Sequence, residues 1–254
     1  MRGKKGNIFD NNLYIKIFKK SSKISFFGLF EKSPHLTYPT KYSKKKDLKK
    51  KYLYILMNKQ TQSAHKQPYF HNTEFEKFDE DLFKKIWALR PKEDQVVKFM
   101  GKEITLPRRI KAFGYDYSGY MGSDQNQCEY ELPEVLENLR DELGLLPYNS
   151  ILINFYEKPS DYIGKHHDSD KQLNKKYMIY TFSIFEKSDD YRILKFTNPK
   201  DKTDTKEFKL TDFSLVGFNR KANQKYKHEV SKVKKSNKNP GKRISITFRE
   251  LKED

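Results

Sequence analysis

Six short stretches of β-prone residues fill the chain from residue 150 onwards, and polar turns separate them. Runs of a few residues rich in Ile, Phe, Val, Thr and Tyr, bounded by such turns, predict β-strands. The predicted strands are residues 150–156, 178–185, 192–196, 206–210, 213–218 and 243–249. Because these strands follow helical patterns, we predict an α+β protein whose second half is a β-sandwich or barrel.

Two amphipathic helices are predicted upstream of the strands. Residues 79–90 carry apolar side chains at helical spacing, and a proline follows them as a stop. Residues 133–143 carry a second apolar stripe, with Pro133 suited to the first turn and Gly144 directly after the last one. Trp87, in the first helix, is expected to pack in the core.

The positive charge of the chain is concentrated near its N-terminus. The 254 residues carry a formal net charge of +18, and residues 1–56 contain 15 Lys and Arg against three acidic residues. We predict a flexible basic extension over residues 1–64 and a folded domain over residues 65–254. The extension has two interpretations: a segment that binds nucleic acid, because lysines on phosphates release counterions, or a solvated lysine-rich tail.

The single cysteine and the short apolar runs restrict where in the cell this protein is expected and whether it crosses a membrane. Cys128 cannot form an internal disulfide, so we expect an intracellular protein, cytoplasmic or nuclear, that is not secreted. The best apolar run, residues 24–30, is far shorter than the roughly 18 residues that a membrane span needs. We therefore expect a soluble monomer with no membrane partner.

One His and one Asp converge in the polar segment 164–170. His166 and Asp168 are two residues apart, so in an extended segment their side chains leave the same side of the backbone. His228 could complete a group of two histidines and one carboxylate, which leaves three positions of an octahedral Fe(II) open for a chelating cosubstrate and O2. The alternative interpretation is a solvated histidine in a polar loop.

The flanking strands present polar side chains on one face. Alternation along residues 243–249 places Arg243 and Arg249 on the same face, opposite three apolar side chains. Residues 150–156 repeat the arrangement and leave Asn154 and Tyr156 together. Arginine binds carboxylates through two parallel hydrogen bonds, so two arginines that face a metal group suit a dicarboxylate such as 2-oxoglutarate.

Taken in chain order, these motifs resemble the AlkB family of Fe(II)/2-oxoglutarate dioxygenases, in particular its branch of nucleic-acid dealkylases. The match covers roughly residues 82–251 and consists of Pro107-Arg108, Asn154-x-Tyr156, His166-x-Asp168, His228 and Arg243-x5-Arg249. The resemblance implies a double-stranded β-helix, or jelly roll, with N-terminal helices. Ser245 departs from the pattern, since Asn usually stands between the two arginines.

The resemblance also implies the roles of these residues. It makes His166, Asp168 and His228 the catalytic ligands of Fe(II). It makes Asn154, Tyr156, Arg243 and Arg249 the residues that hold 2-oxoglutarate, and O2 the second substrate.

An aromatic, glycine-punctuated segment, residues 107–123, resembles the nucleotide-recognition lid of this family. By that match Tyr115 and Tyr117 are the pair of lid residues at the substrate base, where Tyr117 stacks on the base and Tyr115 approaches the pocket, and Arg108 is a further substrate contact. Asp170 would contact the alkylated edge of the base and favour cationic lesions, although the neighbouring Lys171 departs from the acidic residue of some members. The alternative is a surface hairpin with ordinary tyrosines and a surface acid.

The implied function is oxidative demethylation of N-alkylated bases in DNA or RNA, an alkylation repair that releases formaldehyde, succinate and CO2. One alternative keeps the oxygenase chemistry and changes the substrate to a protein or a lipid. Another is a catalytically silent nucleic-acid-binding module. The sequence leaves open the choice between DNA and RNA, between single and double strands, and between lesions.

Overall fold

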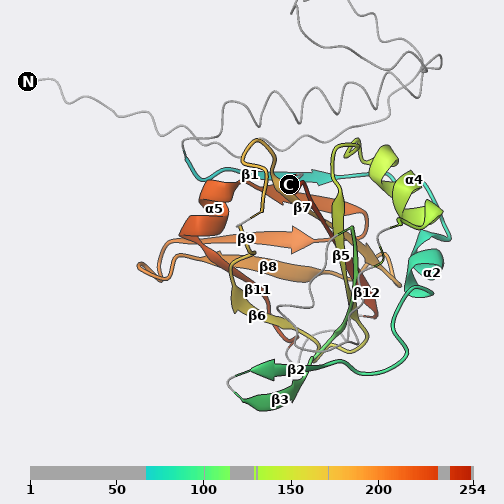
Figure 1. Ribbon diagram of the computed structural model, residues 1–254, viewed down its shortest axis with the longest axis horizontal. Helices are drawn as coiled ribbons and strands as arrows, with labels where there is room; N and C mark the ends of the chain where they lie inside the picture. The colour runs from blue at the N-terminus through green and yellow to red at the C-terminus, as the bar shows by residue number, and fades with distance from the viewer. Residues whose placement is uncertain are drawn as a thin grey trace, which may run out of the picture. The chain divides into compact units, whose positions relative to one another are not determined.

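The computed structural model describes residues 67–99, 101–114, 129, 131–170, 172–233 and 241–252. Antiparallel strands dominate this part of the chain (Figure 1). The larger sheet contains six strands, in the order β1 (Phe70–Glu74), β10 (Ser214–Phe218), β7 (Ile179–Phe185), β12 (Arg243–Arg249), β5 (Ser150–Tyr156) and β4 (Arg109–Phe113). The smaller sheet contains four, in the order β6 (Ile163–His166), β11 (Lys227–Val230), β8 (Arg192–Thr197) and β9 (Thr205–Leu210).

The two sheets pack against each other through an apolar cluster. Strands β7 and β10 contribute Ile179, Val216 and Phe218, and the smaller sheet contributes Leu194 and Phe196, all of them buried. Neighbours in sequence order are not always neighbours in the sheets, since β12 lies between β7 and β5. This arrangement of two antiparallel sheets confirms the predicted jelly roll.

A second apolar cluster lies on the other face of the larger sheet. Helices α2 (Leu82–Trp87) and α4 (Glu134–Glu142) cover that face and bury Ile86 and Leu136 completely (Figure 1). Trp87 is only partly buried there, with its ring 5.8 Å from that of Phe155. The predicted helices upstream of the strands are therefore confirmed as the outer layer of the fold.

Both helices are shorter than predicted at each end, since α2 covers residues 82–87 of the predicted 79–90 and α4 covers residues 134–142 of the predicted 133–143. The main-chain N–H of Asp81 donates to the carboxylate of Asp79, and this local turn delays the start of α2. Pro133 precedes α4 with an extended ψ of 142°, so it caps the helix instead of forming its first turn. Its carbonyl accepts from the N–H groups of Leu136 and Glu137.

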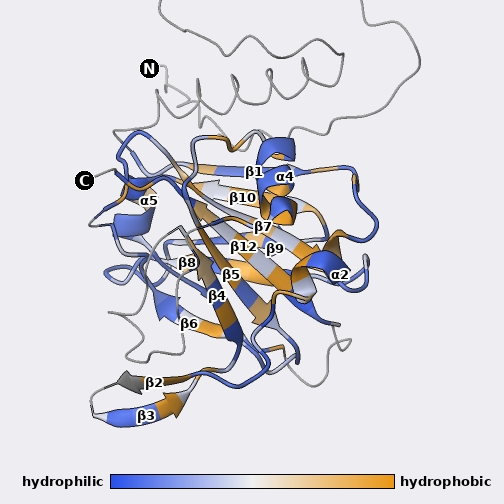
Figure 2. Ribbon diagram, turned by 45° about the vertical axis from the view of Figure 1, so that its right-hand side comes forward, coloured by the Kyte–Doolittle hydropathy of each residue, from blue (hydrophilic) through white to orange (hydrophobic). Residues whose placement is uncertain are grey.

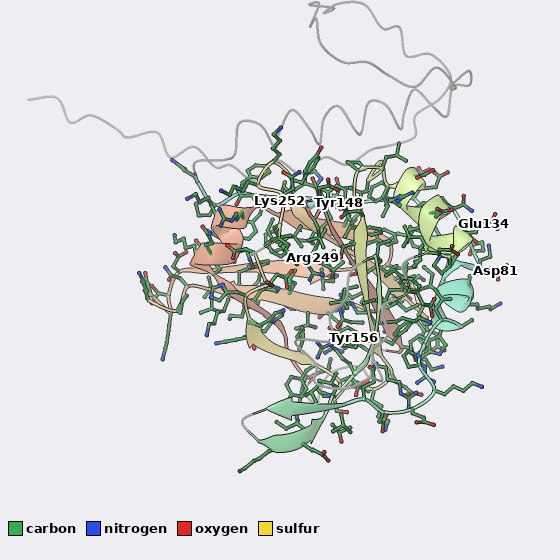
Figure 3. All side chains as sticks on the ribbon, in the orientation of Figure 1. Asp81, Glu134, Tyr148, Tyr156, Arg249 and Lys252 are labelled. Carbon is green, nitrogen blue, oxygen red and sulfur yellow. The ribbon has the colours of Figure 1, made fainter. Side chains whose placement is uncertain are left out.

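Strand β12 divides the larger sheet into an apolar and a polar face, as predicted. All seven of its residues are buried. Ile244, Ile246 and Phe248 join the cluster under the helices, whereas the arginines at both ends of the strand point to the other side, toward the smaller sheet. In Figure 3 the labelled Tyr156 and Arg249 lie on neighbouring strands of the larger sheet.

Several elements were not predicted. Strands β1, β4, β6 and β11 have four or five residues each, and the separate hairpin of β2 (Val96–Phe99) and β3 (Lys102–Thr105) extends away from the sheets (Figure 2). Helix α5 (Arg220–Lys225) lies between β10 and β11 and carries no apolar stripe. These segments are too short or too polar for periodicity to reveal them.

Part of the predicted lid is a sheet strand. Residues 109–113 of the 107–123 segment form β4. Gly114 ends this strand with φ of 74°, and a Cβ at that position would lie 2.0 Å from the carbonyl oxygen of Asn149, so glycine is required. Residues 115–123 lie outside the described residues, as does the predicted extension 1–64. Within the described part of the chain, no helix is long and apolar enough to cross a membrane.

Candidate metal centre and cosubstrate pocket

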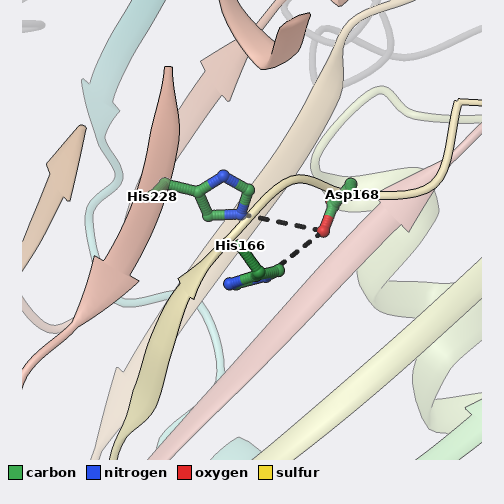
Figure 4. Close-up of side chains that lie close together, drawn as sticks. All are labelled: His166, Asp168 and His228. Carbon is green, nitrogen blue, oxygen red and sulfur yellow. Dashed lines mark ion pairs between the residues drawn. The ribbon is translucent and has the colours of Figure 1, made fainter. Parts of the chain in front are cut away.

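Sheet pairing and one loop bring the predicted metal ligands together. His166 ends β6 and lies directly opposite His228 of β11 in the antiparallel ladder, so both rings leave the same face. Their ring centroids are 4.2 Å apart. Asp168 follows two residues later, and its Oδ1 lies 3.5 Å from Nε2 of His166 and 3.7 Å from Nε2 of His228 (Figure 4). One ligand atom from each residue lies within 4.8 Å of the others.

The surroundings of the two histidines orient their rings, and those of His228 also keep its imidazole neutral. Nδ1 of His166 lies 2.8 Å from the carbonyl oxygen of Gly164, which can only accept, so Nδ1 carries the proton and Nε2 offers its lone pair. His228 is buried against the rings of Phe196 and Phe218. Burial lowers the pKa of His228 to about 3, although the charge of Asp168 acts in the opposite direction.

Asp168 is an ionised carboxylate. Burial is the largest effect on its pKa and raises it, but the charge of Arg249 and the neighbouring His166 together hold the pKa well below its usual range. Nη2 of Arg249 donates to Oδ2 of Asp168 at 2.9 Å. Oδ1 therefore remains the oxygen that faces the two imidazoles. Two imidazole nitrogens and one carboxylate oxygen are a donor set that fits Fe(II).

A second feature is a buried guanidinium without an acidic partner. Arg243 is 1% exposed, and its Nη2 donates to Oγ of Ser183 at 3.0 Å. Its Nε and Nη1 are buried and have no hydrogen-bond partner among the described residues. Burial lowers the pKa of Arg243 to about 10, and the neighbouring Tyr156, whose ring centroid is 4.9 Å from the guanidinium carbon, raises it. Unmade hydrogen bonds on a buried cation are costly, so a carboxylate fits there.

Asn154 and Arg108 lie beside this pocket. Nε of Arg108 donates to Oδ1 of Asn154 at 2.6 Å, and Nη1 donates to the carbonyl of Tyr162 at 3.4 Å. Burial lowers the pKa of Arg108. Ser245 is the strand partner of Asn154. The predicted substrate contact Arg108 therefore bonds to a residue of the predicted cosubstrate group.

Sequence reasoning missed Arg192. This residue is buried in β8, and its Nη2 donates to the carbonyls of Asp161 and Ser231 at 2.8 and 2.6 Å. Its guanidinium carbon lies 5.5 Å from the ring centroid of Tyr156, so Arg192 and Arg243 both contact that ring. The available signal was its position in the alternation of the strand, because Arg192 lies on the same face as the buried Leu194 and Phe196.

Asp170 is held by α5. Its Oδ2 accepts from Nε2 of Gln224 at 2.9 Å and from Nε of Arg220 at 3.2 Å. The hydrogen bond from Gln224, together with the charge of Arg220, lowers the pKa of Asp170 despite partial burial. The predicted base-stacking residues Tyr115 and Tyr117 lie outside the described residues.

Comparisons with known proteins add to this geometry. A profile of the 2OG-Fe(II) oxygenase superfamily matches residues 88–249. The DNA oxidative demethylase ALKBH2 of Bos taurus is 26% identical over 165 residues, which are 61% of this chain and 57% of that protein. The chain thus spans little more than half of the length of this relative. The structure of OsALKBH1 matches with a TM-score of 0.51 and 18% identity, over 72% of this chain and 98% of that chain, and supports the fold.

The profile match covers more than half of the chain and includes the His166, Asp168 and His228 group and both strand-β12 arginines. The superfamily uses Fe(II), 2-oxoglutarate and O2, and the group of two histidines and one aspartate fits an iron ion. The chain belongs to the 2OG-Fe(II) oxygenase superfamily and is an AlkB-like dioxygenase.

Proposed function

We propose that this dioxygenase removes methyl groups oxidatively from N-alkylated bases of DNA or RNA. The N-methyl group is hydroxylated, its carbon then leaves as formaldehyde, and the electron pair of the broken N–C bond stays on the base nitrogen. The proton of the hydroxyl group is released to solvent from a cationic base, or is balanced by an N–H bond on a neutral one. One oxygen atom of O2 enters formaldehyde and the other enters succinate, while 2-oxoglutarate also loses CO2. When bound, iron and 2-oxoglutarate supply this oxidising chemistry together with O2.

In this proposal the chain itself contributes positioning. His166, Asp168 and His228 would hold Fe(II), because two histidines and one carboxylate are a ligand set for this metal. Arg249 donates to Oδ2 of Asp168, which leaves Oδ1 as the oxygen that faces the imidazoles and could bind the metal. No side chain needs to act as a nucleophile.

Arg243 is proposed to bind the carboxylate of 2-oxoglutarate that lies far from the metal. Its two unpartnered nitrogens can donate to both oxygens of one carboxylate. Tyr156 lies beside the same guanidinium, and Asn154 is oriented by Arg108. Arg249 is proposed to contact the cosubstrate at its other end.

The proposed substrate is supported by charge and by similarity. Asp170 lies two residues after Asp168 in sequence, its pKa is lowered, and it would attract a positively charged base such as 1-methyladenine or 3-methylcytosine. Tyr115 and Tyr117 are the proposed stacking residues. The net charge of +18 favours a polyanion, and a relative that is 26% identical is named a DNA oxidative demethylase.

The strongest support for the proposal is the presence of two sites that each lack a binding partner, one for a metal ion and one for a carboxylate. Three neutral or anionic metal ligands converge at one site, and the buried Arg243 lacks a carboxylate at the other. A single dicarboxylate that chelates a metal through its 2-oxo acid end completes both. We therefore infer that one cosubstrate spans the two sites.

The test is a panel of oligonucleotides that carry 1-methyladenine, 3-methylcytosine or 6-methyladenine, each in DNA and in RNA. Formaldehyde and succinate are measured with Fe(II), 2-oxoglutarate and O2 present, and unmodified oligonucleotides of the same sequence are the controls. The proposal expects equimolar formaldehyde and succinate from at least one methylated base. Succinate formation that no methylated oligonucleotide stimulates would move the substrate to another class, such as a protein or a lipid.

A further inference from the structure

The two histidines and the aspartate of the metal group differ in what fixes their main chains. His166 and His228 belong to paired strands, where the ladder sets their backbone positions. Asp168 lies beyond the end of β6, in a loop. Among the described residues, both hydrogen bonds recorded for the main chain of Asp168 come from one side chain, that of Asn223 in α5.

Asn223 holds this peptide through two complementary bonds. Its Oδ1 accepts from the N–H of Asp168 at 3.0 Å, and its Nδ2 donates to the carbonyl of Asp168 at 2.9 Å. The residue is 1% exposed, so water cannot readily replace either bond. A side-chain amide paired in this way with a main-chain amide fixes both the position of Asp168 and the direction in which its carboxylate leaves.

Helix α5 is itself tied to the larger sheet. Asn219 caps the helix by accepting from the N–H of Ala222 at 2.8 Å. The side chain of Asn219 also accepts from the N–H of Tyr69 at 3.1 Å and donates to the carbonyl of Gln67 at 2.8 Å. The helix is therefore a fixed support for the loop that it contacts.

The same helix contacts the loop on both sides of Asp168. The carbonyl of Asn223 accepts a hydrogen bond from Nδ1 of His167. Arg220 and Gln224 bond to Oδ2 of Asp170. One short helix thus fixes the position of the loop that carries both Asp168, the proposed metal ligand, and Asp170, the proposed substrate contact.

We infer that Asn223 is the positioning residue of the iron site: it never contacts the metal and sets the site through the main chain of Asp168. The inference rests on the proposed role of Asp168 as an iron ligand. Asparagine suits the position because it offers one donor and one acceptor at the same reach. Loss of both bonds lets the loop move Oδ1 away from the two imidazoles.

The test compares Asn223→Leu, which keeps the shape and removes both bonds, with Tyr226→Phe, which removes the hydrogen bonds from the residue directly after the same helix to Asp204. Fe(II) affinity is measured anaerobically in the presence of 2-oxoglutarate by the visible charge-transfer absorbance. The unfolding temperature of each metal-free variant is measured in parallel. Asn223→Ala is a second variant in case the leucine does not fold.

We expect the Asn223 variants to bind Fe(II) about 10- to 100-fold more weakly, which is the usual effect of a residue that orients a metal ligand. Tyr226→Phe should lower the unfolding temperature and keep the Fe(II) affinity within about twofold of the wild type. Wild-type affinity in Asn223→Leu, or equal weakening in Tyr226→Phe at an equal loss of stability, would overturn the inference, because the role would then be general folding.

The outcome for the wild type separates this inference from the proposed function. A wild-type protein that binds no Fe(II) would overturn both. A wild-type protein that binds Fe(II) but demethylates no oligonucleotide would contradict the proposed substrate alone, and the loss of affinity in the Asn223 variants would still support the positioning role.

Discussion

The strand-held and the loop-held parts of the candidate site differ in how the sequence encodes them. His228, Arg243 and Arg249 lie on strands, and alternation along each strand sets the face to which they point. Asp168 and Asp170 lie in a loop that depends on contacts with α5, more than 50 residues away in sequence. Strand-held residues can therefore be placed from a local pattern, whereas loop-held residues need the tertiary structure.

The largest expected effect comes from removing a metal ligand, whichever part of the molecule holds it. His166→Ala, Asp168→Ala and His228→Ala should each abolish 2-oxoglutarate turnover, because two remaining ligands bind Fe(II) weakly and misplace the open positions. Succinate formation measures the loss. Substantial turnover in any one of these variants would remove that residue from the metal group.

The next largest effect concerns Arg243, a strand-held residue that should favour 2-oxoglutarate binding but lower the stability of the cosubstrate-free protein. Arg243→Met should weaken 2-oxoglutarate binding by about 2 to 5 kcal/mol, since it removes one partner of a buried charged pair. It should also stabilise the cosubstrate-free protein, because a buried cation with two unpartnered nitrogens is removed. Titration and thermal unfolding measure the two effects.

Lys206→Met, on an exposed position of β9, is the matched control and should change neither quantity. Unchanged 2-oxoglutarate affinity in Arg243→Met would place the carboxylate elsewhere. A lower unfolding temperature without cosubstrate would show that the guanidinium has a stabilising partner.

A smaller effect should come from the substrate side of the site. Asp170→Asn and Tyr117→Ala should each reduce oligonucleotide demethylation by about 1 to 3 kcal/mol in transition-state stabilisation, with Asp170→Asn acting mainly on cationic bases. Decarboxylation of 2-oxoglutarate without substrate should persist in both variants. The control is Asp201→Asn in a surface turn, and demethylation at wild-type rate in both test variants would contradict the nucleic-acid assignment.

The smallest effect should come from His167, which neighbours two proposed metal ligands. Its side chain points to α5 and bonds to the carbonyl of Asn223, so it contacts none of the group of three. His167→Ala should retain most activity and most Fe(II) affinity. An inactive His167→Ala would mean that the loop register, and with it the choice of His166, is wrong.

The sequence predicts the strands that carry clear alternation. The bounds of β5 and β12 agree residue by residue with the prediction, and the two arginines lie on the predicted face. Strand β6 was missed because Ile163 is followed by glycine, lysine and histidine, which give no apolar alternation. The pairing of His166 with His228 could therefore not be predicted, although the sequence pattern groups both residues with Asp168 and the structure places the three side chains close together.

Contacts that join distant parts of the chain were beyond sequence reasoning. Arg249 donates a hydrogen bond to the carboxylate of Asp168, which is 81 residues earlier. Arg108 donates one to the side-chain oxygen of Asn154, which is 46 residues later. No local sequence pattern predicts either hydrogen bond. Asn223 was missed for a related reason, since its six-residue helix has no apolar stripe and its importance comes from a single peptide that it holds.

The iron site and the cosubstrate pocket are tested together by an anaerobic titration of the wild type with Fe(II) in the presence of 2-oxoglutarate. We expect a visible charge-transfer absorbance that saturates at one iron per chain, is absent in Asp168→Ala, and needs a much higher 2-oxoglutarate concentration in Arg243→Met. An absorbance that is unchanged in Asp168→Ala, or no absorbance in the wild type, would show that this group of three residues is not the iron site.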